Sequence, residues 1–307
     1  MLAIFWKETA DHFGRRRSAM LLGLVMVGVV WGAFVDKTAI ITGGTGFFYL
    51  DIFTTTSGVP LSLHAFIAFF GPIIGIALGF DAINGERTQG TLARILAQPV
   101  HRDSVYNGKF LAGLLTLSVA VFSMGVAVVG IGMFRLGVPP SGDEMVRLTG
   151  FGLIVVLYLA FWLALAMAAS IFLRNAVASA LMSLAGWIVL SIFVGFLATG
   201  VAERIVPDVQ TADEALSRFN VETWIARASP SQVFSEATGI LLDPIQGRVL
   251  GSLALVQPER LEGLLVSPVS AGQSLQLVWP HIVVLLAMVS TLLVVSYARF
   301  MREEIRA

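Results

Sequence analysis

The chain has 307 residues, of which 56% are hydrophobic and only 13% are charged, and its mean hydropathy is +0.84. The 20 basic and 20 acidic residues give a net charge of zero, so no overall positive field indicates nucleic acid as a partner. Cysteine is absent, which excludes disulfides, thiol chemistry and cysteine-ligated metal sites.

Soluble domains carry roughly 25% charged residues, so this composition predicts an all-α polytopic membrane protein in which residues 1–307 form a single transmembrane domain. The first expected element is an amphipathic helix over residues 1–18, with apolar side chains such as Ile4 set among charges and a closing cluster Arg15-Arg16-Arg17. We expect it to lie in the headgroup layer of the bilayer. The arginines by themselves are equally compatible with a simple anchor on the positive side of the membrane.

Six apolar stretches are long enough, or nearly so, to cross roughly 30 Å of hydrocarbon. They are residues 19–35, 61–80, 110–134, 151–173, 177–200 and 279–297. No small-residue cleavage pattern follows the first stretch, so it is expected to remain as a span rather than to be removed as a signal peptide.

Glycines spaced four residues apart mark close approach between helices in the first two spans. They are Gly28 and Gly32 in the first span and Gly71, Gly75 and Gly79 in the second. Packing within one bundle explains them, and an interface for dimerisation or translocation is the sharper alternative.

Basic residues predict the orientation of the chain. With the N-terminus inside, most Lys and Arg residues of the short connecting segments fall on the inner side of the membrane. We therefore expect a multi-pass protein of the inner or plasma membrane with both termini and residues 81–109 in the cytoplasm.

The polar segment 81–109, between the second and third spans, is divided by a glycine and a proline. Gly90 permits a sharp bend, Thr91 can cap a short helix, and Pro99 stops that helix. The apolar face of this short helix consists of Leu92, Ile95 and Leu96. A projecting amphipathic helix of this kind suits docking in a groove of a partner protein, and the alternative is a surface helix packed on its own bundle.

The largest polar region, residues 201–278, precedes the last span and is expected on the outer side. Ser229-Pro230 has the form of a helix start, and Asp243-Pro244 ends the apolar helical pattern that follows. We expect this short helix to rest on the outer surface of the bundle. Residues 213–227 are a candidate for a second short helix.

Several kinds of chemistry are missing from the sequence. The six spans contain no Asp, Glu, Lys or Arg, which disfavours proton or sodium coupling, and His64 and His281 are interpreted as interfacial residues rather than a metal site. Gly108-Lys109 is followed by Phe110, so no phosphate-binding loop is present. We expect no enzyme activity and no bound cofactor, and any energy for work must come from another chain.

The loop carries a specific resemblance. Its pattern, followed by Gly108-Lys109-Phe110, resembles the loop between the second and third spans of ABC type-2 exporter permeases. The residues that carry it are Asp81, Gly85, Glu86, Arg87, Gly90, Thr91, Leu92, Leu96, Pro99, Val100 and Arg102. More loosely, the whole chain is similar to the type V subset that contains the permease of the nitrous oxide reductase maturation system.

This resemblance implies that residues 1–18 form an elbow helix and that the 81–109 loop is a coupling helix touching a separate ATPase subunit, which binds ATP and Mg. It also implies that two permease copies pair around a central path. Glu86, Arg87, Gly90 and Thr91 are then the residues to test for coupling. Glu86 and Arg87 could instead pair with neighbouring residues and simply hold the loop.

The leading expectation is therefore the membrane subunit of an ATP-driven exporter. One alternative is a complex that uses ATP to reshape an extracytoplasmic partner through residues 201–278, without moving a substrate. The other is a self-contained channel or carrier.

Overall fold

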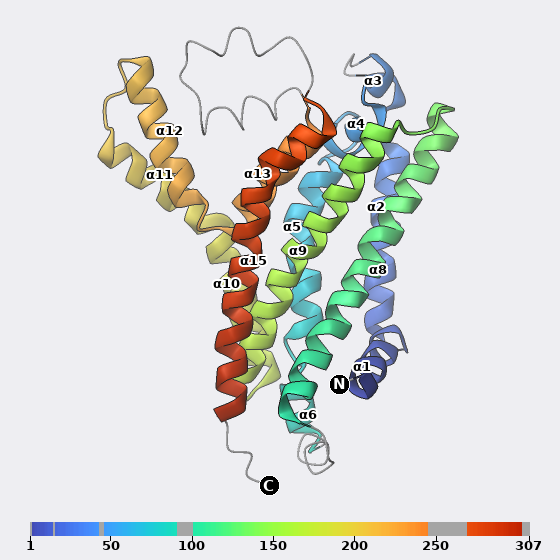
Figure 1. Ribbon diagram of the computed structural model, residues 1–307, viewed down its shortest axis with the longest axis vertical. Helices are drawn as coiled ribbons and strands as arrows, with labels where there is room; N and C mark the ends of the chain where they lie inside the picture. Colours follow the sequence, from blue (N-terminus) through green and yellow to red (C-terminus); the bar gives the residue numbers. More distant parts are fainter. Residues whose placement is uncertain (1, 15, 43–45, 91–100, 245–268, 303–307) are drawn as a thin grey trace.

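The computed structural model describes residues 2–14, 16–42, 46–90, 101–244 and 269–302, and their regular structure is entirely helical (Figure 1). At the lower end of the bundle lie the start of the chain, α6 and the last turn of α15, and α3, α4 and α12 lie at the upper end. In chain order the elements are α1 (Leu2–Gly14), α2 (Arg16–Phe34), α3 (Lys37–Thr42), α4 (Phe48–Thr54), α5 (Leu63–Gly79), α6 (Asn84–Thr88), α8 (Arg102–Leu136), α9 (Gly142–Phe172), α10 (Ala176–Ile188), the π-helical turn η1 (Val189–Phe193), α11 (Val194–Ile205), α12 (Ala212–Ala226), α13 (Pro230–Leu242) and α15 (Ala271–Arg302).

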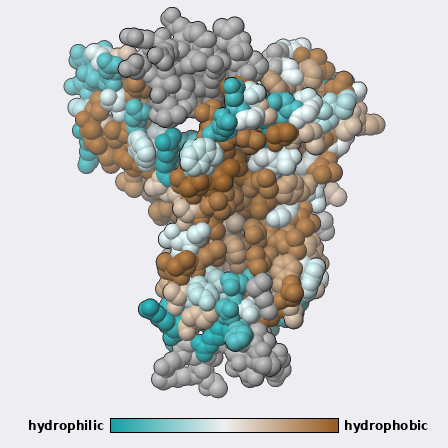
Figure 2. All heavy atoms as spheres, in the orientation of Figure 1, coloured by the Kyte–Doolittle hydropathy of each residue, from teal (hydrophilic) through white to brown (hydrophobic). Residues whose placement is uncertain are grey.

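Five helical runs are long and apolar enough to cross a membrane, and they coincide with the second to sixth predicted spans. They are Leu63–Thr88, Arg102–Leu136, Gly142–Phe172, Ala176–Ile205 and Ala271–Arg302. The first predicted span coincides with α2, whose apolar part, Val25–Phe34, is shorter, so the sixth crossing stays a prediction. Figure 2 shows apolar residues over the middle of the molecule and polar residues toward both ends, as a multi-pass membrane protein requires.

The core of the bundle is built around α9. In the most apolar 18-residue stretch of α9, 78% of the residues are buried, against 11% in the corresponding stretch of Ala176–Ile205 and 17% in that of Ala271–Arg302. Its bulky side chains, including the fully buried Tyr158 and Trp162, fill the space between α5, α8, α13 and α15. The helices α10, α11 and α15 therefore present long apolar faces to their surroundings.

The glycines of the second predicted span lie against α9 of the same chain. A Cβ atom on Gly75 would lie 2.8 Å from the carbonyl oxygen of Leu159, and one on Gly79 would lie 2.7 Å from that of Leu163. Gly71 meets the side chain of Leu159. On the other side of the bundle, Gly28 and Gly32 face Met124 and Val128 of α8. In the described structure, these five glycines serve packing inside one chain.

The region between the last two spans has one element in an unexpected place. Thr211 and Glu214 form a capping box at the start of α12, close to the expected second short helix, and Ser229 caps α13 with Pro230 as its first residue. However, α13 does not rest on the surface. It packs into the upper half of the bundle against α9 and α15, because Phe234 is fully buried and stacks on Tyr158 at 4.3 Å.

The contact between α5 and α9 generates a stability prediction. We expect Gly75→Ala to lower the free energy of unfolding by about 1–3 kcal/mol, because the new methyl group would overlap the backbone of α9 and force the helices apart. The matched control is Gly125→Ala in α8, where nothing lies within 4 Å of the added Cβ. Titration of the folded protein with a denaturing detergent measures both, and equal stability of the two variants would contradict this packing.

Candidate functional site

The predicted coupling residues divide between described and undescribed parts of the chain. Glu86, Arg87 and Gly90 are described, at the lower end of the bundle just after α5. Thr91, Leu92, Ile95, Leu96 and Pro99 lie outside the described residues. Gly90 has a φ of +66°, a left-handed backbone that glycine adopts without strain and that fits the expected bend.

A ring of four alternating charges joins the two sides of this loop to the N-terminal helix. The Nζ of Lys109, at the start of α8, lies 2.9 Å from Glu8 Oε1 and 2.8 Å from Glu86 Oε1. The Nζ of Lys7 closes the ring at 3.0 Å from Glu8 Oε1 and 3.6 Å from Glu86 Oε1. We call these four residues the charge ring, and it binds α1, α6 and α8 into one unit.

Because most of the charge ring is buried, each of its buried charges depends on its partners. The side chain of Lys109 is only 5% exposed, and those of Glu8 and Glu86 are 11% and 12% exposed, whereas Lys7 is 54% exposed. A buried ammonium needs carboxylates close by to offset its lost hydration. Burial by itself would raise the pKa of Glu8, but Lys109 and Lys7 hold that pKa below its usual value. The charged form of Glu8 is therefore the one that the fold stabilises.

A second polar junction connects the same loop to the lower end of α9. The hydroxyl oxygen of Ser170 accepts hydrogen bonds from the backbone amides of Ile83 and Asn84, at 3.1 and 3.0 Å. Arg87 donates to the carbonyl oxygen of Ile171 and to Asn84 Oδ1, both at 3.4 Å. Glu86 and Arg87 thus hold the loop in the described structure, as the alternative interpretation of these two residues supposed.

The N-terminal helix turns its polar face to the protein and its apolar face outward. Glu8, Thr9 and His12 are buried, and His12 Nδ1 lies 3.2 Å from the hydroxyl of Thr116 in α8. Leu2 and Trp6 are 69% and 62% exposed. This orientation is the reverse of that in a soluble protein, and it suits a helix whose outer face lies among lipids.

A polar cavity of about 370 Å³ lies beside the charge ring, between α1, α5, α8 and α9. Side chains of the charge ring, Asp11 and Asp81 line this cavity, together with Leu163 and Met167 of α9.

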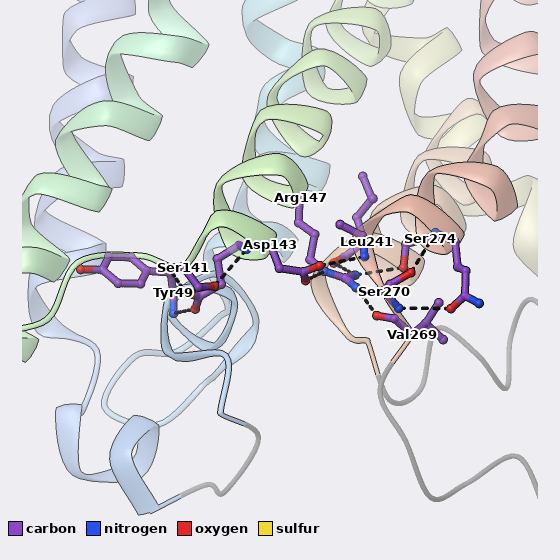
Figure 3. Close-up of polar contacts among 11 residues, drawn as sticks. Tyr49, Ser141, Asp143, Arg147, Leu241, Val269, Ser270 and Ser274 are labelled. Atoms are coloured by element: carbon purple, nitrogen blue, oxygen red, sulfur yellow. Dashed lines mark hydrogen bonds and ion pairs between the residues drawn. The ribbon is translucent and has the colours of Figure 1, made fainter.

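A second buried polar cluster lies at the upper end of α9 (Figure 3). Arg147 is fully buried, and its Nε donates to Asp143 Oδ2 at 2.6 Å. Its two terminal nitrogens donate to the carbonyl oxygens of Leu241 and Val269 and to the hydroxyl of Ser274. The cluster therefore ties α9 to the end of α13 and the start of α15.

The helix α13 also carries a carboxylate into the bundle. Glu236 accepts hydrogen bonds from Arg227 at 2.9 Å, Gln232 at 3.1 Å and His281 of α15 at 3.2 Å. Burial opposes ionisation, but these donors hold the pKa of Glu236 below its usual value. The other expected interfacial histidine, His64, bonds to Thr238 of the same helix. Among the described residues, no group of three metal-binding side chains occurs.

Sequence reasoning did not single out Lys109, Glu8 or Arg147 as site residues. In the sequence, Lys109 belongs only to the loop pattern, and no motif includes Arg147. One signal was available, since Glu8 and Lys109 both adjoin apolar stretches where a charge is costly without a partner. Their partners lie far away in the sequence, so the pairing itself could not be read from it.

Comparison with known proteins connects these features to a family. The model of a family described as ABC-2 family transporter protein matches residues 2–305. The chain is similar to the probable ABC transporter permease protein NosY of Pseudomonas aeruginosa, at 31% identity over 150 residues, which are 48% of this chain and 49% of that protein. It is also similar to the protein of the same name from Stutzerimonas stutzeri, at 31% over 136 residues, which are 43% and 45% of the two chains. The match thus spans about half the length of these curated relatives.

The charge ring generates a prediction about Lys109. We expect Lys109→Met to lower the free energy of unfolding by about 3–5 kcal/mol, because it leaves two buried carboxylates facing each other. Lys7→Met is the matched control and should cost at most about 1 kcal/mol, because Lys7 is the exposed corner of the ring. Detergent titration followed by tryptophan fluorescence measures both. Adding Glu8→Gln to Lys109→Met should restore part of the loss, and the ring would be wrong if it deepened the loss.

The lowered pKa of Glu8 gives the direction of a pH effect. The carboxylate stabilises the fold above its unfolded pKa of about 4.5, and this contribution disappears as the pH falls through the lower folded pKa. We expect the difference in thermal midpoint between the wild type and Glu8→Gln to be largest at neutral pH and to shrink below about pH 4.5. A constant difference across this range would show that Glu8 is not held as a charged group.

Proposed function

The chain belongs to the ABC-2 family of transporter proteins, and on this premise we propose that it is the membrane-spanning permease of an ATP-driven exporter. In this proposal a separate ATPase subunit binds ATP and Mg and docks on the 81–109 loop. The permease itself hydrolyses nothing and binds no cofactor.

The observation that carries the proposal is the charge ring. Glu86 lies near the start of the 81–109 loop and Lys109 at its end. Lys109 pairs with Glu8 of α1, and Glu86 pairs with both Lys109 and Lys7 of α1. A force applied to the loop would therefore act on α1, α6 and α8 together, rather than bending one flexible connection. A docking loop needs such a connection to transmit the movement of a partner subunit to the membrane-spanning helices.

The proposed orientation follows from the charges at the two ends. The lower end carries basic side chains of the ring and, near the end of α15, Arg299 and Arg302. By the positive-inside rule this end lies in the cytoplasm, where an ATPase can reach the loop. The apolar face of α1, with Leu2 and Trp6 exposed, would then rest in the inner headgroup layer as an elbow helix.

We also propose that two copies pair around a central path. The five glycines first considered for a dimer interface lie against α8 and α9 of their own chain, so they do not supply it. The long exposed faces of α10, η1 and α11 remain for lipid and for a second copy, with Phe196 and Leu197 among their exposed side chains. A helix face of this kind needs only shape complementarity to pair within a bilayer.

A second candidate function is an ATP-driven complex that acts on an extracytoplasmic partner without moving a substrate. Arg147 favours it, because a fully buried arginine ties α9 to both Leu241 and Val269 in the region that would face such a partner. A self-contained channel or carrier fits less well, since the only carboxylate that α13 carries into the described bundle, Glu236, is engaged by three donors.

The proposal is tested by purifying the protein through a tag on this chain and measuring ATPase activity. We expect an ATPase to co-purify, and Glu86→Ala to reduce the ligand-dependent part of its turnover at least about tenfold, which corresponds to about 1.4 kcal/mol of lost coupling. A replacement at Gly90-Thr91 should act in the same direction.

The matched control is Glu203→Ala in α11, which removes an exposed carboxylate paired with Arg218 at the other end of the molecule. It should leave turnover unchanged. If the chain purifies alone and every loop variant is silent, the loop is only a structural turn and the channel or carrier becomes the better account.

A further inference from the structure

The helix α9 is clasped by buried polar contacts at both of its ends. At the lower end, Ser170 accepts the amides of Ile83 and Asn84, which lead into the 81–109 loop. At the upper end, Arg147 donates to the carbonyls of Leu241 and Val269. The same helix therefore makes buried polar contacts with other segments of the chain on both sides of the proposed membrane.

Between these contacts α9 is an uninterrupted rod. Its 31 residues span about 46 Å at 1.5 Å per residue, without an internal proline. The helix α8 is also without an internal proline, but the polar contacts to Leu241 and Val269 come from α9. The remaining long helices are interrupted, because α5 contains Pro72, α15 contains Pro280, and the π turn η1 separates α10 from α11. Such features are the usual places where a helix bends.

The upper contacts of Arg147 converge on a single point of the chain. The amide of Val269 donates to the carbonyl oxygen of Pro244 at 3.2 Å, which joins the chain just after α13 to the chain just before α15. The amide of Ala271 donates to Asp143 Oδ1 at 2.8 Å, on the carboxylate that also holds Arg147. We call Leu241, Pro244, Val269 and Ala271 the upper base.

An arginine is needed at this position because the guanidinium offers several fixed donors. Its three nitrogens donate to four acceptors, which lie on α9, α13, α15 and Val269, two residues before the start of α15. A lysine would keep the charge beside Asp143 but could not span these acceptors at once. The guanidinium of Arg147 therefore fixes the position of the upper base relative to α9.

We propose that α9 is the rod, and Arg147 the positioning residue, through which a movement of the 81–109 loop reaches the upper base on the other side of the membrane. This inference rests on the proposed function, which supplies the movement. The α11–α12 hairpin is expected not to move with α9. It stands away from α9 in Figure 1, and its ion pair between Arg218 and Glu203 lies within the hairpin.

Hydrogen exchange at four amides tests this proposal in the permease–ATPase complex held in lipid nanodiscs. Ile83 and Asn84 report the lower contact, and Val269 and Ala271 report the upper base. Exchange is compared between the nucleotide-free complex and the complex trapped with ATP and vanadate. The wild type should show a nucleotide-dependent change at both pairs of amides.

In Arg147→Lys we expect the change at Ile83 and Asn84 to persist and the change at Val269 and Ala271 to be lost. The matched control, Arg218→Lys in α12, should behave as the wild type. Ser274→Ala removes one acceptor while leaving Arg147 in place, so it should weaken the upper response even if Arg147→Lys folds poorly. The thermal midpoint of each variant separates a lost response from a lost fold.

The outcomes separate this inference from the proposed function. A lower response without an upper response in the wild type, or an upper response that survives in both Arg147→Lys and Ser274→Ala, overturns the role of α9 and Arg147 and leaves the proposed function standing. The absence of any response to nucleotide at either pair of amides overturns the proposed function and this inference with it.

Discussion

The contact of α5 with α9 at backbone distance determines where the other elements lie. Without side chains at Gly75 and Gly79, α5 lies directly on the carbonyl oxygens of Leu159 and Leu163. This approach brings the end of α5 beside Ser170, so that the amides of Ile83 and Asn84 find an acceptor there. The 81–109 loop consequently begins at a fixed point next to α8 and α1. Larger residues at the two glycines would move that starting point as well as the helix.

The charge ring and the Arg147 cluster lie at the two ends of the bundle, where they form networks that are costly to break. In an apolar medium an isolated ammonium or guanidinium is strongly unfavourable, so Lys109 and Arg147 are stable only with their full sets of acceptors. The resulting networks are specific in geometry, because each donor must meet its own acceptor. Polar networks of this kind give an otherwise featureless apolar bundle its register, and they lie where the chain leaves the membrane.

The same arrangement relates the two candidate functions to each other. An exporter and a complex that acts on an outer partner both need a rigid connection from the loop to the opposite face, and α9 with its two polar junctions has the form of that connection. They differ in whether the exposed faces of α10, η1 and α11 line a path between copies or only meet lipid. The buried position of α13, held by His64, His281 and Tyr158 through its polar side chains, also means that this helix is part of the bundle and not a detachable cover.

The sequence by itself determined the class of protein and most of the local structure. The five long apolar helices, the start of α13 at Ser229-Pro230 and the bend at Gly90 follow from hydropathy, capping and glycine chemistry, which depend on residues adjacent in the chain. The loop pattern was also enough to indicate the family that the comparisons show. The apolar part of α2, Val25–Phe34, falls short of a full span, so the count of six spans is still a prediction.

Only the tertiary structure decided which distant residues meet. Lys109 lies about a hundred positions from Glu8, and Arg147 lies just as far from the carbonyls of Leu241 and Val269 that it binds. Local patterns carry no record of such pairings, because a charge beside a span reads the same whether it faces water or a partner. The placement of α13 inside the bundle was decided in the same way, by the apolar space that α9 and α15 leave for Phe234.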